Sequence, residues 1–235
     1  LGAVQFMVVL DIAIVNVALP SIQVDLGFSQ ENLQWVISAY ALVFGGFLLL
    51  GGRAADLLGR RRMFLSGLAV FTAGSLAAGL AWSEASLIGA RSLQGLGAAI
   101  ISPAALSILM TTFSEGRERN IALGVWGAVG GFGAAAGVLL GGVFTDLLSW
   151  EWLFFINIPV GLAAMALAPV LLGESRNRRA SSFDALGAVL VTAGLSTAVF
   201  AITQANDYGW GSGKSIGLFT GAVALLVAFV LAETR

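Results

Sequence analysis

Residues 51–62 read GGRAADLLGRRR and form a short basic turn between two long apolar stretches, 33–52 and 63–81. Four arginines in so short a segment are typical of the cytoplasmic end of a membrane hairpin, because basic residues stay on the cytoplasmic side of a bilayer. Anchoring alone does not call for an acid, yet the turn also holds Asp56. Asp56 and Arg60 have the i, i+4 spacing of a helical pair. The turn therefore predicts a hairpin with a defined structure at its cytoplasmic end.

Apolar stretches of membrane-spanning length recur along the whole chain. A helix needs about 20 residues to cross roughly 30 Å of hydrocarbon. With 58% hydrophobic and only 11% charged residues among 235, the chain has too much apolar surface for one soluble core. We therefore expect an all-α, polytopic membrane protein. Its eight expected spans are 1–20, 33–52, 63–81, 86–109, 121–145, 152–172, 184–203 and 215–232.

Basic residues are distributed very unequally between the two sets of loops. Ten of the twelve lie on one side, and the opposite loops hold only Lys214. The positive-inside rule places these ten, and with them the N-terminus, in the cytoplasm. The ten are Arg53, Arg60, Arg61, Arg62, Arg117, Arg119, Arg176, Arg178, Arg179 and Arg235.

Composition also excludes several classes of function. The chain has no His and no Cys, and its formal net charge is −1. These values argue against a metal site, a nucleophile–base pair and nucleic-acid binding. Residues 1–21 lack the basic start of a signal peptide and contain Asp11. Because the chain begins at Leu1, we expect a piece of a longer protein whose first helix has lost its beginning.

Two ionisable residues lie inside expected spans, Asp11 in the first and Arg91 in the fourth. Each costs at least about 2.5 kcal/mol at a helix centre, so neither is expected to face lipid. Asp11 is interpreted either as a proton carrier or as one half of a permanent ion pair, with Arg91 as the obvious partner. Arg91 keeps its own proton, so its role would be to tune a neighbouring carboxylate or to control access to it.

Other polar and aromatic residues lie within the spans. Arg91, Gln94 and Gly95 share one helical face, and Gln34 and Ser38 form a similar pair on the second span. Such residues either line a cavity or bond across helices. The candidates for cavity lining are Asn16, Gln34, Ser38, Tyr40, Gln94 and Trp126.

The fifth span is unusually rich in glycine. Gly133, Gly137 and Gly141 form two overlapping GxxxG steps on one face, and Gly142 follows them. Such steps predict close contact with another helix. The contact could be static or could allow the helices to slide or rock.

Several motifs together resemble the Major Facilitator Superfamily. The turn from Gly52 through Asp56 and Gly59 to Arg61 is similar to its signature between spans 2 and 3. Residues 87–97 resemble the span 4 motif of proton-coupled members, and the run ending at Gly142 resembles the span 5 motif of drug exporters, with Val138 where that motif has Pro. Three further segments resemble the fourteen-span drug:proton antiporters, namely 10–20 (with Ala13 in place of the usual Thr), 154–161 and 183–187.

The resemblance implies a fold and a set of roles. Residues 1–172 would form the N-terminal six-helix bundle, 173–183 a cytoplasmic connecting loop, and 184–235 two additional spans. A second bundle, missing from this chain, would be its partner. The resemblance implies proton coupling by Asp11 and Arg91. It implies a cytoplasmic gate made of Gly52, Asp56, Gly59, Arg60 and Arg61.

The resulting expectation is a proton-coupled exporter of amphipathic small molecules in a bacterial plasma membrane, working by alternating access. It would need no cofactor, only the proton gradient, and its partners would be substrate, protons and lipid, with no nucleic acid. One alternative is a narrow-substrate facilitator or importer of the same fold. A non-transporting sensor or scaffold is the other alternative, although it would not need the costly Asp11 and Arg91. An enzyme is not expected.

Overall fold

The computed structural model describes residues 1–175 and 185–233, and all regular structure within these ranges is helical. The helices are α1 (Gly2–Leu26), α2 (Gln30–Leu33), α3 (Trp35–Leu58), α4 (Arg60–Gly79), α5 (Glu84–Thr112), α6 (Arg117–Leu147), α7 (Trp152–Phe155), α8 (Asn157–Leu171), α9 (Ala185–Tyr208) and α10 (Gly213–Glu233).

Eight helical segments of the described chain are long and apolar enough to span a membrane, as expected. The short helices α2 and α7 extend α3 and α8. Two ends differ clearly from expectation, since α1 continues to Leu26 and α9 to Tyr208. Hydropathy marks only the part of a helix that lies in hydrocarbon, whereas the hydrogen-bonded helix continues into the interface. The chain is therefore a multi-pass membrane protein.

Glycine and serine define several helix ends. Gly27 ends α1 with φ of 68°, a left-handed conformation that favours glycine. Gly59 separates α3 from α4 with φ of 112°. Ser83 begins α5 with a capping box, in which its side chain accepts a hydrogen bond from the Ser86 amide.

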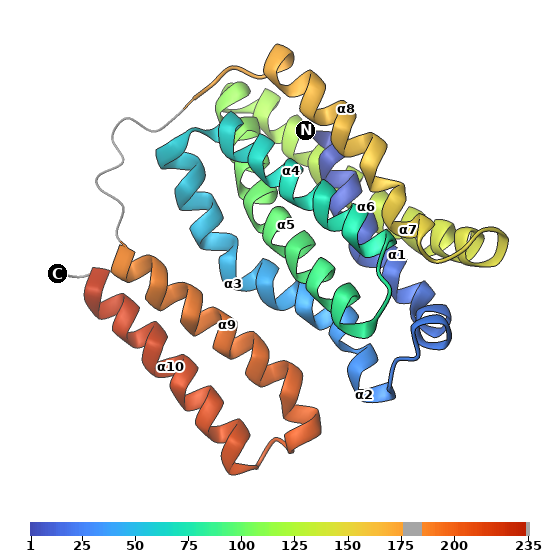
Figure 1. Ribbon diagram of the computed structural model, residues 1–235. Helices are drawn as coiled ribbons and strands as arrows, with labels where there is room; N and C mark the ends of the chain where they lie inside the picture. Colours follow the sequence, from blue (N-terminus) through green and yellow to red (C-terminus); the bar gives the residue numbers. More distant parts are fainter. Residues whose placement is uncertain (176–184, 234–235) are drawn as a thin grey trace.

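The six long helices between residues 2 and 171 pack against one another, and α9 and α10 lie at one edge (Figure 1). The closest packing is between α4 and α5, α3 and α5, and α1 and α6. α9 packs on α3, and α10 packs on α9. At the α3–α9 contact, a side-chain carbon at Gly46 would collide with Ser196, so the absent side chain lets the two backbones approach.

The bundle has two apolar cores, one toward each end. One includes Phe64, Phe71 and Ile101, and the other includes Leu87 and Phe154. On α4 and α5, buried polar residues lie between the segments that contribute to the two cores, and Asp11 of α1 and Asn157 of α8 contact these residues. A polar layer therefore separates two apolar ones in the middle of the bundle.

Candidate functional site

The polar layer is centred on an ion pair between the two ionisable residues found in the spans. The Nη1 atom of Arg91 on α5 lies 2.6 Å from Oδ2 of Asp11 on α1. Their side chains are 1% and 0% exposed. Of the two interpretations left open for Asp11, the pairing with Arg91 is thus present. A pair so fully removed from water depends on good geometry and on further hydrogen bonds.

Those further bonds come from two buried amides. Oδ1 of Asp11 accepts hydrogen bonds from Nε2 of Gln94 at 2.9 Å and from Nδ2 of Asn157 at 2.8 Å. The same two nitrogens contact the hydroxyl oxygen of Ser75, at 2.8 Å and 3.4 Å. Together, Arg91 and the two amides donate three hydrogen bonds to the carboxylate of Asp11, and the carboxylate is the acceptor in all three. This arrangement suits an ionised carboxylate, which only accepts.

The guanidinium of Arg91 has partners on several sides. Its Nε atom donates to the backbone oxygen of Val36 at 3.0 Å, and Nη1 also donates to Oε1 of Gln94 at 2.8 Å. The Cζ atom lies 4.5 Å from the centre of the Tyr40 ring and 5.7 Å from that of Phe154. Helices α3 and α7 therefore help α5 to hold the cation in place.

The residues expected to line a cavity differ in how far they are buried. Gln94 and Tyr40 are buried in or beside the polar layer. Gln94 bonds across helices to Asp11 of α1 and Ser75 of α4, which is the second of the two interpretations given for this polar face, and the Tyr40 ring lies beside Arg91. Asn16 and Gln34 are exposed, and Ser38 is half-buried. The side chain of Asn16 donates to the Ile12 oxygen on its own helix.

Trp126 does border open space. A cavity of about 630 Å³ lies among α1, α3, α5 and α6. Its lining is mainly apolar, with a few polar groups near the turn after α3. Lining residues include Gln5, Phe44, Arg53, Asp56, Ser102 and Trp126.

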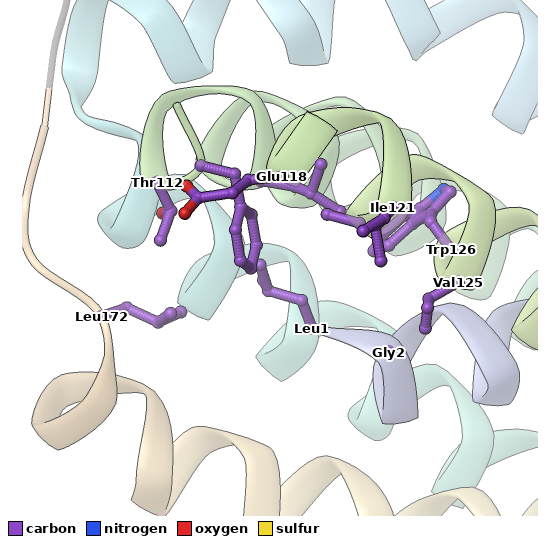
Figure 2. Close-up of a pocket in the computed structure, with 11 residues that line it drawn as sticks. Leu1, Gly2, Thr112, Glu118, Ile121, Val125, Trp126 and Leu172 are labelled. Atoms are coloured by element: carbon purple, nitrogen blue, oxygen red, sulfur yellow. The ribbon is translucent and has the colours of Figure 1, made fainter. Parts of the chain in front are cut away.

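A second cavity, of about 720 Å³, lies near the N-terminus between Leu1, the end of α5 and the start of α6. Figure 2 shows Glu118, Ile121, Val125 and Trp126 arranged along α6 on one side, with Leu1 and Leu172 across from them. Glu118 is its only charged lining residue among the described ones. Trp126 joins the linings of the two cavities.

The expected gate residues form one structure at the α3–α4 turn. Arg60 donates to Oδ1 of Asp56 from Nη2 at 3.0 Å and from Nε at 3.3 Å, which confirms the expected i, i+4 pair. Gly59 provides the left-handed backbone of the turn. Gly52 lies against Pro103 of α5, at van der Waals distance for an added side-chain carbon.

The segment after α8 completes this turn, which the sequence did not predict. Glu174 accepts hydrogen bonds from the backbone amides of Arg61 and Arg62, both at 3.2 Å. Its carboxylate thus occupies the N-terminus of α4, where unpaired amides and the helix dipole favour an anion. In return, Nη1 of Arg61 donates to the Leu172 oxygen, beyond the last residue of α8, at 3.0 Å.

The GxxxG face of α6 makes the expected close contact with another helix, and the structure shows that this helix is α1. A side-chain carbon at Gly133 would lie 3.0 Å from the Phe6 oxygen, and one at Gly141 would lie 3.0 Å from the Ile14 oxygen. At Gly137 it would lie 2.7 Å from Cβ of Ala13. Gly142 belongs to another face and has no atom of the described chain within 4 Å of such a carbon.

Some expected features cannot be placed. Arg176, Arg178, Arg179 and Arg235 lie outside the described residues, as do Phe183 and Asp184. Two members of the polar layer were missed. Asn157 was noted only as part of a motif, and its sole signal is an amide inside an apolar span. Ser75 gives no such signal, because an isolated serine is common in membrane helices.

Comparison with known proteins gives consistent results. The family model of the Major Facilitator Superfamily matches residues 1–233. The chain is 47% identical over 233 residues to the cephamycin export protein CmcT of Amycolatopsis lactamdurans, covering 98% of this chain and 48% of that protein. It is also 47% identical over 233 residues to the puromycin resistance protein pur8 of Streptomyces alboniger, covering 99% and 46%. The chain thus spans about half the length of the curated relatives it matches.

This chain also resembles a solved structure, and at low sequence identity the resemblance shows the fold alone. The crystal structure of the POT family transporter PepTSo superposes with a TM-score of 0.66 at 16% sequence identity, over 98% of this chain and 51% of that one.

Proposed function

The chain belongs to the Major Facilitator Superfamily, and on that premise we propose that it works as the N-terminal part of a proton-driven exporter of amphipathic small molecules. The observation that carries the proposal is the buried pair of Asp11 and Arg91. A purely structural core would be as stable, or more stable, with apolar residues of the same volume. Similarity to the cephamycin export protein supports efflux of organic molecules.

Asp11 is the proton carrier in this mechanism. When it is ionised, it holds α1 to α5 through Arg91 and to α8 through Asn157. A proton on the carboxylate removes its charge, so the ion pair with Arg91 is lost and the hydrogen bonds that Gln94 and Asn157 donate become weaker. Arg91 keeps its bonds to Val36 and Gln94. Protonation thereby loosens the link between α1 and α5 without leaving the cation isolated.

The proton gradient is the energy source, and no cofactor is required. Each charge that crosses the membrane field adds about 2.3 kcal/mol per 100 mV. Protonation of Asp11 from outside favours release of substrate there, and deprotonation toward the cytoplasm restores binding. The N-terminus and the turn containing Asp56 and Arg60 are cytoplasmic in this proposal, in accordance with the positive-inside rule.

Substrate binds in a cavity between this bundle and a second one. The space of about 630 Å³ beside Phe44 and Trp126 is large enough for part of a drug-sized molecule and is mostly apolar. Its few polar groups, such as Gln5 and Ser102, would orient an amphipathic ligand. The turn of Gly52, Asp56, Gly59, Arg60 and Arg61 lies at one end of this space and acts as the cytoplasmic gate.

The test uses the full-length transporter that contains this chain. Cells expressing it are loaded with a cationic dye, and efflux is followed with and without a protonophore. We expect protonophore-sensitive efflux that disappears in Asp11→Asn, while the variant still reaches the membrane. Asp146→Asn is the matched control, because Asp146 is an exposed carboxylate near the end of α6.

Two results would contradict the proposal. Normal active efflux in Asp11→Asn would remove Asp11 from proton coupling. Absence of efflux over a broad panel of dyes and antibiotics would instead favour a narrow-substrate facilitator or importer of the same fold, since fold alone does not set the substrate.

A further inference from the structure

Asn157 is one of the two residues of the polar layer to which no sequence pattern assigned a role. It is the first residue of α8, is 1% exposed, and places Nδ2 2.8 Å from Oδ1 of Asp11. We propose that Asn157 is a positioning residue for the proton-carrying carboxylate: it holds Oδ1 in place and thereby sets the pH dependence of proton-driven efflux. The inference rests on the proposed function and extends it to a residue on a different helix.

The hydrogen atoms of the two amides are fully accounted for. An amide NH₂ group donates two hydrogen bonds. Gln94 uses one for Asp11 and one for the oxygen of Ser75. Asn157 makes the same two contacts from the opposite helix. Ser75 thus fixes the direction of both amides, and neither can turn its NH₂ group away from Asp11 without losing two bonds.

The position of Asn157 follows from how α8 packs on α4. Gly161 lies one turn after Asn157, and a side-chain carbon there would collide with Thr72 of α4. Thr72 in turn precedes Ser75 by one turn. The close approach at Gly161 therefore brings Asn157 beside Ser75, on the side of α8 that faces Asp11. The amide is held by backbone packing as well as by its own hydrogen bonds.

Removal of this donor affects the two protonation states of Asp11 unequally. Ionised Asp11 uses the NH₂ groups of Asn157 and Gln94 on one oxygen, so loss of Asn157 leaves that oxygen with one donor. A neutral carboxyl group has less charge to stabilise and loses less. Hydrogen bonds to charged groups are roughly twice as strong as neutral ones. The pH profile of proton-driven efflux by the variant should therefore move toward alkaline pH.

The other groups that surround Asp11 in the described residues are not altered by a substitution at Asn157. The titratable or charged side chains that face Asp11 are Arg91 from α5 and Tyr40 from α3. The neighbouring helices α4 and α8 contribute the uncharged Ser75 and Asn157. Helix α6 contributes its glycine face. A change at Asn157 removes a donor and leaves every one of these charges in place.

The test measures the pH dependence of proton-driven efflux by the full-length transporter in membrane vesicles. Asn157→Leu keeps the number and branching of the side-chain heavy atoms and removes the donor. We expect the midpoint of its pH profile to move by about one unit toward alkaline pH, equivalent to about 1.4 kcal/mol. Ser75→Ala should shift the profile in the same direction by less, because both amides stay but lose their common anchor. Asn206→Leu, at the far end of α9, is the control and should not shift it.

The outcomes separate this inference from the proposed function. If Asp11→Asn abolishes protonophore-sensitive efflux while Asn157→Leu lowers efflux equally at every pH, Asn157 is merely structural and the inference is wrong. If Asp11→Asn retains protonophore-sensitive efflux, the proposed function fails first. Should Asn157→Leu not reach the membrane, Ser75→Ala decides, since an unshifted profile there also overturns the inference.

Discussion

The guanidinium of Arg91 lies over the ring of Tyr40, with Cζ 4.5 Å from the ring centre. The ring attracts the cation through its π face and offers it no acceptor atom for a hydrogen bond. Its hydroxyl is buried and has no hydrogen-bond partner among the described residues. Ring and hydroxyl of Tyr40 therefore have opposite effects on stability.

Tyr40→Phe and Tyr40→Leu separate these two effects. Tyr40→Phe removes an unsatisfied buried hydroxyl and keeps the ring, so the free energy of unfolding should rise by about 1 kcal/mol. Tyr40→Leu also removes the ring under Arg91 and should lower it by about 3 kcal/mol. SDS-driven unfolding in mixed micelles measures both. A destabilised Tyr40→Phe protein would show that the hydroxyl has a partner the packing does not reveal.

Arg91→Met tests how strongly the ion pair is coupled. The substitution keeps an unbranched side chain but leaves Asp11 buried without a cation, so we expect a loss of about 3–5 kcal/mol. The double variant Asp11→Asn/Arg91→Met has no buried charge and should recover most of this loss. A double-mutant cycle measured by the same unfolding experiment gives the coupling. Additive single effects would mean that the 2.6 Å contact contributes nothing specific.

Glu174→Gln tests the anion at the start of α4. The variant keeps the shape of the side chain but loses the charge that faces the amides of Arg61 and Arg62. We expect a loss of about 1 kcal/mol that becomes smaller at high salt, because the Glu174 side chain is 28% exposed and partly screened. Glu115→Gln is the control, since that carboxylate is 88% exposed. Equal effects of the two variants at low salt would contradict the helix-terminus role.

The spans could be predicted because hydropathy needs only the composition of a window of about 20 residues. The pairing of Asp11 with Arg91 was within reach for the same reason, since a bilayer makes two lone charges costly. Asn157 and Ser75 were not, because their roles depend on how α4 and α8 are rotated about their axes. Gln94 shows the same limit: its helical face was recognised as polar, but not which helix that face meets. Glu174 acts through backbone amides, which have no sequence signature.

Gly137 and Gly142 belong to the same glycine-rich motif, yet the structure gives them different surroundings. A side-chain carbon at Gly137 would lie 2.7 Å from Cβ of Ala13 and 3.0 Å from the Leu10 oxygen of α1. At Gly142 it would meet no described atom within 4 Å. Gly137→Ala should therefore force α1 and α6 apart and destabilise the chain.

Gly142→Ala should have the opposite sign, since alanine exceeds glycine in helix propensity by about 1 kcal/mol. Both variants are made in the 235-residue chain and compared by unfolding in mixed micelles. The expected difference is at least about 2 kcal/mol, because the overlap at Gly137 involves backbone, which cannot rotate away as a side chain does. If both alanines were tolerated equally, the contact between α1 and α6 would have to be looser than the packing at Gly137 requires.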